Sequence, residues 1–578
     1  MKRILIAASF LAGFVFMSAQ SDSLEAAQRE KINKTWYHMD YTKSKVYGVN
    51  TQNAYSYLES KGLKPTSIVV GVLDSGVEVD HPGLIKNIWT NPGEIAGNGI
   101  DDDKNGYIDD VHGWNFLGSK NGDVDVDNME VTRVVKKYKP IFEGENSAQN
   151  KANQAKMPEE FAMYLKSKTI FNEKSITAQQ GYANYARIQA LIPSAIKLLD
   201  GKKLTPEVLA ALVPSTQEEA MAKQLLQGAS QDPMLAGKSG EEVQKVLSEQ
   251  IKQAVDYYGP QAKQQYNLDF DPRKELVGDD YENYNERVYG NNHYEGPDAE
   301  HGTHVAGIIA GLPQGEEPQY GVAYKVAKIM SVRTVPNGDE RDKDVANAIR
   351  YAVDNGAKIL NMSFGKPVSP GKEHVWEAFQ YAQKKGVLLV KAAGNENEDI
   401  EVNTYYPTNF KNASDPSAFI DNMIVVGAST NTSVDLRAGF SNYNAKMVDV
   451  FAPGAEIYST VPDGKYEYLQ GTSMASPVVA GAAAVLLSYM PELTPAQLIE
   501  SLVKSVNVSN GNANLPNGET DRFDSISRAG GVIDLAKAAE YAFTKFYKGN
   551  SADSKNFRRK AGVVTSKTIK KHPMKSKS

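Results

Sequence analysis

The sequence contains no cysteine among its 578 residues. A chain without cysteine cannot be cross-linked by disulfide bonds, whatever compartment it occupies. Its stability must therefore come from the burial of a hydrophobic core and from any cations that it binds. The hydrophobic content of 41% and the charged content of 23% are ordinary for a globular protein, and the length allows two or three domains.

Long apolar runs are scarce as well, and the clearest one stands at the N-terminus. Residues 1–19 have the pattern of a signal peptide. A membrane anchor is the alternative, but the apolar run is short for a membrane-spanning helix. We find no other stretch that is long and apolar enough to cross a membrane. We therefore expect an exported protein, which is secreted, periplasmic or at the cell surface. The basic, apolar and small-residue regions of the signal are Lys2-Arg3, Ile4 to Met17 and Ser18-Ala19.

Acidic residues are missing from the end of the chain. Residues 554–578 contain nine Lys or Arg and no Asp or Glu, although the whole chain has a net charge of −6. Such a tail can dock on nucleic acid, on an anionic surface or on the acidic remainder of the protein. The plainer interpretation, which we favour for residues 548–578, is a solvated and disordered terminus.

Apolar β-branched runs alternate with helical patterns along much of the chain. The runs occupy residues 68–73, 328–332, 358–362, 387–390 and 423–427, and helical patterns at 344–355 and 375–385 separate several of them. This alternation predicts an α/β fold with a doubly wound, mainly parallel sheet and flanking helices. Asp74 and Asn395 come at the ends of two predicted strands, where parallel sheets collect functional side chains.

The middle of the chain looks helical rather than α/β. Residues 128–276 contain helix-start patterns at Thr205, at Ser215-Thr216 and at the capping box Ser239–Glu242. We predict an inserted helical subdomain without catalytic residues, which divides a catalytic domain into residues 47–127 and 277–547. Its role is open between substrate exclusion, partner docking and packing.

Three short segments each hold one member of a possible catalytic triad. Asp74 lies in Val70 to Gly76, His301 begins His301 to Gly307, and Ser473 lies in Gly471 to Pro477. A serine hydroxyl is a poor nucleophile near pH 7, so it needs a base within reach, and that base needs an anion to fix its tautomer. Asp, His, Ser is one of the orders in which such triads occur. These residues indicate a serine endopeptidase.

With Asn361 to Gly365 and Ala392 to Asn395, these segments resemble the subtilisin-like serine proteases over about residues 45–125 and 290–545. The resemblance implies that Ser473 attacks the peptide carbonyl to form an acyl-enzyme intermediate, with His301 as the base and Asp74 orienting it. It assigns Asn395 to the oxyanion hole, beside the backbone N–H of Ser473. His304 then has a packing role; a His301–His304 metal pair is the alternative, and it lacks a further ligand.

The resemblance also implies the primary specificity pocket. Its walls would be Ser363, Phe364 and Gly365 on one side and Ala393 and Gly394 on the other. Small wall residues leave room for a sizeable substrate side chain. The charged segment Asp339–Asp342 falls where the family pairs with the substrate as an added strand, and Glu396 falls at the pocket rim. We therefore expect some preference for basic residues before the cleaved bond. Tyr406-Pro407 matches a position where the family often has a cis-proline.

The segment Asn98 to Asp110 has the first half of a calcium-loop spacing. Acidic and amide side chains alternate, and Gly106 permits the sharp turn. His112 stands where such loops place a bidentate Glu, so Asp109 or Asp110 must complete the shell; a solvated acidic loop is the alternative. We predict a structural calcium ion held by Asp101, Asp103, Asn105, Tyr107 and Asp110.

Other classes of function stay open at this point. A catalytically silent binding or scaffold protein on the same fold is the main alternative, although no triad or oxyanion residue is substituted here. An esterase is another. The expected partners are protein or peptide substrates, nothing requires nucleic acid, and the oligomeric state is open. Residues 20–46 are too few to bury a core of their own, so the chain either folds without a propeptide or uses them as a short inhibitory arm.

Overall fold

The computed structural model describes residue 30 and residues 33–412 and 415–547. The predicted signal peptide and the basic tail both lie outside the described residues. The body is built on a nine-stranded sheet in the order β14-β17-β11-β10-β7-β6-β1-β5-β2, in which every neighbouring pair except β14–β17 is parallel. The strands are β1 (Ile68–Asp74), β2 (Gly113–Asn115), β5 (Ala327–Arg333), β6 (Ile359–Met362), β7 (Leu388–Ala392), β10 (Met423–Ser429), β11 (Val450–Pro453), β14 (Asn507–Val508) and β17 (Gly531–Val532).

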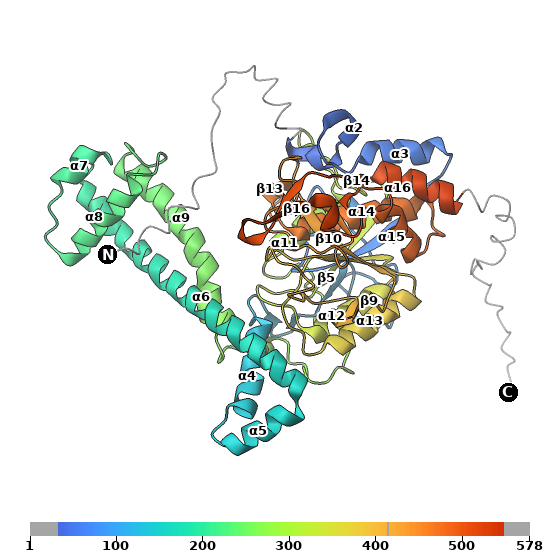
Figure 1. Ribbon diagram of the computed structural model, residues 1–578, viewed down its shortest axis with the longest axis horizontal. Helices are drawn as coiled ribbons and strands as arrows, with labels where there is room; N and C mark the ends of the chain where they lie inside the picture. Colours follow the sequence, from blue (N-terminus) through green and yellow to red (C-terminus); the bar gives the residue numbers. More distant parts are fainter. Residues whose placement is uncertain (1–29, 31–32, 413–414, 548–578) are drawn as a thin grey trace, which may run out of the picture.

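Helices cover both faces of this sheet (Figure 1). One face carries α3 (Thr51–Ser60), α11 (Glu300–Ala310), α14 (Thr472–Tyr489), α15 (Pro495–Val503) and α16 (Leu535–Ala542), and the other carries α12 (Asp342–Asp354) and α13 (Lys372–Lys384). The predicted α/β fold with a mainly parallel sheet is therefore confirmed. Four two-stranded hairpins complete the body: β3 (Gly118–Ser119) with β4 (Gly122–Asp123), β8 (Phe410–Asn412) with β9 (Asp415–Ala418), β12 (Ile457–Val461) with β13 (Lys465–Leu469), and β15 (Asn512–Asn514) with β16 (Thr520–Arg522).

Strand β1 explains why the sequence reads as a continuous apolar run. Val70 and Val72 belong to the hydrophobic core on one face of the sheet, and Leu73 belongs to the core on the other. Both faces of the sheet are covered. A central parallel strand therefore has apolar side chains on both faces, and its sequence does not alternate between apolar and polar residues. The run ends at Asp74, which is 2% exposed.

Helix α14 corrects the expectation that no further stretch could span a membrane. It is long and apolar enough by length and composition, yet 94% of its most apolar window is buried inside the protein. It packs against β10, β7, β6 and β11. Its apolar character is that of a core helix.

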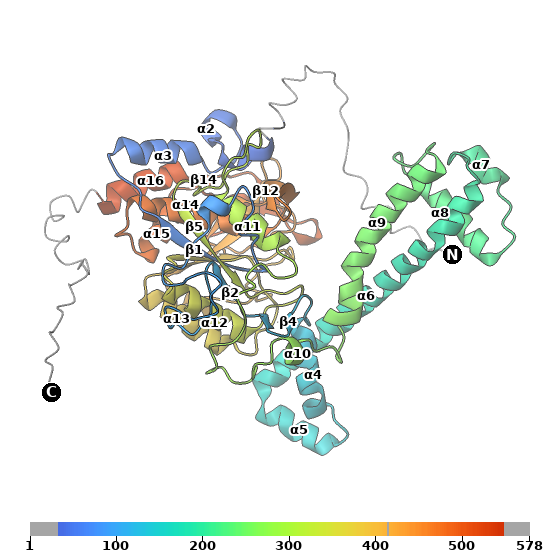
Figure 2. The ribbon, with the colours of Figure 1, turned by 180° about the vertical axis from the view of Figure 1, so that it is seen from behind.

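The middle of the chain forms an arm that leaves the body (Figures 1 and 2). Side chains of Thr205, Thr216 and Ser239 cap the helices that follow them, and Ser239 forms the predicted capping box with Glu242. The long helices α6 and α9 pack along each other. The helices are α4 (Glu130–Phe142), α5 (Ser147–Lys156), α6 (Pro158–Leu199), α7 (Pro206–Ala211), α8 (Gln217–Ala229), α9 (Gly240–Pro260) and α10 (Arg273–Leu276).

The described part of the N-terminal segment is packed into the body. It contains the short helices η1 (Trp36–His38) and α2 (Tyr41–Ser44). The indole N–H of Trp36 donates to the carbonyl of Glu456 at 3.1 Å, and the Tyr37 side chain is fully buried. Trp36 and Tyr37 are therefore an integral part of the body, and none of residues 33–46 lines the cleft described below.

Candidate active site

Asp74 and His301 form a direct hydrogen bond between two elements that are 227 residues apart. Asp74 ends β1, and His301 lies in the first turn of α11. The Nδ1–H of His301 donates to Asp74 Oδ1 at 2.6 Å, and the backbone N–H of Ser75 donates to the same oxygen at 2.8 Å. This bond leaves Nε2 of His301 as the nitrogen that can accept a proton.

The residue after the histidine allows this close approach. A Cβ atom on Gly302 would lie 2.0 Å from the carbonyl oxygen of Gly76 and 3.2 Å from the Cβ of Asp74. No side chain fits there, so glycine is required for α11 to come close enough for His301 to reach Asp74.

The local charges favour the protonated form of His301. Burial alone would lower the pKa of His301, but Asp74, Asp298 and Glu300 together raise it above its usual value. His304, one turn further on, is fully buried, and burial lowers its pKa to about 3. Its Nε2–H donates to the carbonyl of Glu467, which agrees with the predicted packing role.

Ser473 stands in the first turn of α14 and exchanges two hydrogen bonds with Ser363. The Ser473 hydroxyl donates to the Ser363 carbonyl at 3.1 Å, and the Ser363 hydroxyl donates to the Ser473 carbonyl at 2.8 Å. Among the described residues the Ser473 hydroxyl thus faces Ser363 rather than His301. Catalytic hydrogen bonds are often looser in a free enzyme than in its complexes, and a rotation of the serine side chain changes this partner.

Asn395 has its amide oriented by Thr472. The backbone N–H and the hydroxyl of Thr472 both donate to Asn395 Oδ1 at 2.9 Å. The Nδ2 group is therefore directed away from Thr472, and it lies close to Gly471, as does the backbone N–H of Ser473. A Cβ atom on Gly471 would lie 3.4 Å from Asn395 Nδ2 and 3.5 Å from the backbone nitrogen of Ser473, so both N–H groups border the same space beside the serine.

One cleft of about 390 Å³ gathers these residues. It is lined by Asp74, His301, Asn395 and Ser473, and also by Ser363, Phe364, Gly365 and Gly394 of the predicted pocket walls. Ala393 is the exception, because its side chain is fully buried in the hydrophobic core and Ala392 lines the cleft in its place. Tyr405, which the sequence analysis did not single out, also lines the cleft. Its neighbouring bond, Tyr406-Pro407, is cis.

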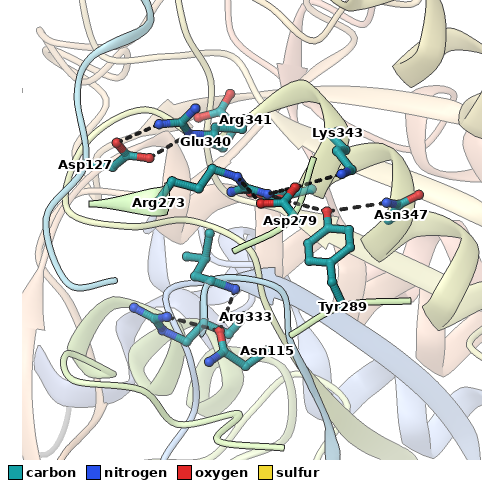
Figure 3. Close-up of polar contacts among 12 residues, drawn as sticks. Asn115, Asp127, Arg273, Asp279, Tyr289, Arg333, Glu340, Arg341, Lys343 and Asn347 are labelled. Carbon is teal, nitrogen blue, oxygen red and sulfur yellow. Dashed lines mark hydrogen bonds and ion pairs between the residues drawn. The ribbon is translucent and has the colours of Figure 1, made fainter. Parts of the chain in front are cut away.

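The charged segment Asp339–Asp342 is not free to meet a substrate. All four side chains are buried, and three of them contact residues at the base of the arm or Lys366. Arg341 forms two hydrogen bonds to Asp127, at 2.7 and 3.0 Å (Figure 3). Asp339 accepts from the backbone N–H of Glu130, and Asp342 pairs with Lys366 at 2.9 Å.

Glu340 is the member of this segment that lines the cleft. Its Oε1 atom has no hydrogen-bond partner, and burial raises the pKa of Glu340 to about 8. We expected residues 339–342 to offer several charged groups to basic residues of the substrate. Of these four residues, only the buried carboxyl group of Glu340 lines the cleft.

The predicted calcium loop gathers acidic oxygens, with one addition. Carboxylate oxygens of Asp101, Asp103 and Glu94 lie within 4.8 Å of one another. Glu94 precedes the loop, so the spacing of residues within the loop could not predict it as a ligand. Asp110 is not one of these three; it accepts hydrogen bonds from Asn91, Asn105 and Tyr351, and the first two also donate to Asp103.

Asn105 and Tyr107 are held by their own turn. The Asn105 backbone N–H donates to Asp101 and Asp103, and the Tyr107 backbone N–H donates to the side chain of Asn105. Ligands at 2.3–2.6 Å on opposite sides of a calcium ion are about 5 Å apart, so the spacing of the three carboxylates fits this ion.

The fold and the cleft define a class: an α/β protein with aspartate, histidine and serine gathered at one edge of a parallel sheet, beside a pair of N–H donors. The chain belongs to the subtilase family, whose family model matches residues 66–527. Thermitase from Thermoactinomyces vulgaris is 41% identical over 189 residues, which cover 32% of this chain and 61% of thermitase. Subtilisin DY from Bacillus licheniformis is 34% identical over 241 residues, which cover 42% of this chain and 77% of that protein.

A solved structure of a cold adapted subtilisin-like serine proteinase is also similar. It has 32% sequence identity and a TM-score of 0.31, over 41% of this chain and 72% of that one. The chain thus spans about three fifths of the length of thermitase, and that match covers about a third of this chain.

Proposed function

We propose that this chain is an exported serine endopeptidase that hydrolyses peptide bonds through Asp74, His301 and Ser473. The observation that carries the proposal is the 2.6 Å hydrogen bond from His301 Nδ1 to Asp74, in one cleft with Ser473 and Asn395. Membership of the subtilase family supports the same activity. No observation favours a silent scaffold, because all four groups that the chemistry needs are present and gathered.

Acylation begins when the Ser473 hydroxyl rotates from Ser363 toward His301. Its oxygen attacks the peptide carbonyl carbon while Nε2 of His301 takes its proton. Asp74 stabilises the imidazolium that forms and holds its tautomer. The protonated His301 then gives its proton to the leaving amine, and the peptide C–N bond breaks to leave an ester on Ser473.

Deacylation repeats these steps with water as the nucleophile. In both steps the carbonyl oxygen gains negative charge, which Asn395 Nδ2 and the backbone N–H of Ser473 stabilise. Because Thr472 already orients the Asn395 amide, these donors need little rearrangement as the charge develops.

The test of this proposal compares the wild type with Ser473→Ala on casein near pH 8. We expect cleavage by the wild type alone, and labelling of Ser473 by a small alkyl fluorophosphonate in the wild type alone. A folded wild type that neither cleaves protein nor takes the label would contradict the proposal and favour a binding protein.

We also infer a structural calcium ion at Glu94, Asp101 and Asp103. The closeness of the three carboxylates supports it, since like charges at this distance repel unless a cation compensates them. When bound, the ion would cross-link the loop of residues 94–110. It takes no part in the proposed peptide chemistry.

The calcium site predicts that a chelator lowers the melting temperature of the wild type and that added calcium restores it. Asp103→Asn should reduce this calcium-dependent shift, because it removes one of the three charges. Asp521→Asn, on the exposed strand β16, is the matched control. A melting temperature that does not depend on calcium would contradict the site.

Export is the remaining part of the proposal. It rests on residues 1–19 of the sequence. One similar protein, from Bacillus subtilis, is described as a cell wall-associated protease, and this chain covers 25% of it. The proposed substrates are proteins or peptides.

A further inference from the structure

The hollow next to the reacting serine decides which substrate side chain precedes the cleaved bond. A substrate whose carbonyl oxygen rests on Asn395 and the N–H of Ser473 must direct the adjacent side chain between the neighbouring wall segments. These walls follow β6 and β7, which pair in parallel, and Ser363 is bonded directly to Ser473. The hollow between the walls is therefore the primary specificity pocket of the proposed enzyme.

The ring of Tyr405 stands between these two walls. A Cβ atom on Gly365 would lie 2.3 Å from Cε1 of the ring, and a Cβ atom on Gly394 would lie 2.9 Å from Cδ1. Both glycines thus present their bare Cα atoms to the same ring. Tyr405 fits because the walls have no side chains there, so the space that the small residues leave is already taken.

Several contacts fix the ring in this position. The main chain of Tyr406 pairs with Lys366, with the two N–H···O distances at 2.8 and 3.0 Å, which anchors the segment to the wall that contains Gly365. The ammonium group of the buried Lys391 lies 5.1 Å from the ring centroid. Burial and the neighbouring Glu396 raise the pKa of Tyr405, and Glu396 itself accepts a hydrogen bond from Asn442 at 2.6 Å.

We propose that Tyr405 fills the primary specificity pocket, so that this chain cleaves after small residues, namely glycine, alanine or serine. This inference rests on the proposed function and names its substrate class. It reverses the expectation from the wall residues alone, which leave room for a sizeable side chain. The three residues that make the pocket shallow are Gly365, Gly394 and Tyr405.

The test uses tetrapeptide p-nitroanilides that differ only in the residue before the scissile bond: Gly, Ala, Leu or Phe. For the wild type we expect kcat/KM to be at least about tenfold higher for Ala than for Phe, because a filled pocket cannot bury a large ring. Tyr405→Gly should reverse this order, with a gain for Phe of about 10- to 100-fold. Tyr405→Phe keeps the ring without the hydroxyl and should keep the wild-type order.

Two results would overturn the inference. One is a wild type that hydrolyses the Phe peptide as well as the Ala peptide. The other is a Tyr405→Gly variant that still prefers Ala while Ser473 takes the alkyl fluorophosphonate label. If Tyr405→Gly does not fold, the profiles of the wild type and Tyr405→Phe decide the matter. Loss of labelling in a folded wild type would instead contradict the proposed function, and this inference with it.

Discussion

His301 is surrounded by more negative charge than Asp74 alone supplies. Asp298 and Glu300 both raise the pKa of His301, and Asp298 lines the cleft beside it. A base must be neutral to accept the serine proton, and a raised pKa means that the imidazole becomes neutral only at a higher pH. The acidic surroundings of the proposed base thus set the lower pH limit of activity.

The expected consequence is a rise of kcat/KM with pH whose midpoint lies above 6.5, the ordinary pKa of histidine. Asp298→Asn removes one of the raising charges and should move this midpoint to lower pH. Asp521→Asn, a remote and exposed substitution, should leave it unchanged. The measurement is kcat/KM from pH 5 to 9, and an unchanged midpoint in Asp298→Asn would contradict this account of the base.

At the scale of elements, buried ion pairs join the base of the arm to the body. We call this set the arm seam, and it comprises Asp127, Glu130, Arg133, Arg341 and Lys366. Glu130 and Lys366 have side chains exposed by no more than 3%, and their charged atoms are 2.6 Å apart. Arg133 also contacts Glu130, at 2.8 Å, and burial would raise the pKa of Glu130, but Arg133 and Lys366 lower it well below its usual range.

Removing Glu130 leaves the buried Arg133 and Lys366 with one counter-charge fewer. Glu130→Gln should therefore lower the free energy of unfolding by about 3–5 kcal/mol. The double variant Glu130→Met with Lys366→Met should regain little of this loss, because it leaves Asp342 without Lys366 and Arg133 without Glu130. The measurement is unfolding in urea, followed by circular dichroism.

A matched control is an exposed ion pair between the arm and the segment that follows it. Glu282 pairs with Lys137 at 3.1 Å, but both side chains are at least half exposed. Glu282→Gln should change the free energy of unfolding by less than about 1 kcal/mol. If Glu130→Gln and Glu282→Gln changed the free energy of unfolding equally, the arm seam would not stabilise the fold more than an exposed ion pair does.

Many elements of the body and the arm could be predicted from the sequence because their signals are local. The apolar run before Asp74 predicts β1, and Ser239 with Glu242 predicts the start of α9. The order of motifs predicts that Asp74, His301, Ser473 and Asn395 come together, and they line one cleft.

What escaped prediction depends on partners that are distant in the sequence. The charges of residues 339–342 were expected at a substrate-facing edge, because their partners Asp127 and Glu130 precede them by about 200 residues. Glu94 lies outside the loop whose spacing defined the metal ligands. Tyr405 belongs to neither pocket wall, so the glycines of the walls predict an open pocket that its ring in fact fills.

The whole molecule consists of a body and an arm with its own hydrophobic clusters. One cluster, at the outer end, joins α6, α8 and α9 through side chains such as Leu199, Leu226 and Val243. A second cluster lies at the base, between α4 and α6, and it includes Val368 of the body. The outer part of the arm therefore has a core that shares no side chain with the body.

This division predicts different results for a short and a long deletion. Gly181 of α6 packs against the ring of Tyr258 of α9, so the chain can be rejoined there. Replacement of residues 184–255 by a short glycine–serine link should leave a folded protein with activity within about threefold of the wild type. Deletion of residues 128–276 should give insoluble protein, because it removes Glu130, the buried partner of Lys366, and Arg273, the buried partner of Asp344.

Thermal unfolding and peptide hydrolysis measure both outcomes. Loss of activity in a stably folded, shortened protein would show that the outer arm acts on the substrate. A soluble and active product of the long deletion would show that the arm seam is dispensable.

The position of β1 in the sheet has a consequence for the order of synthesis. This early strand pairs with β5 and β6, and both are translated only after the entire arm. Until then its two edges have no permanent neighbours, and the nascent chain must stay unassembled or be sheltered by other proteins. Ser473 emerges later still. The proposed peptidase is therefore inert during the synthesis of its first 472 residues, since its working parts cannot meet before Ser473 is translated.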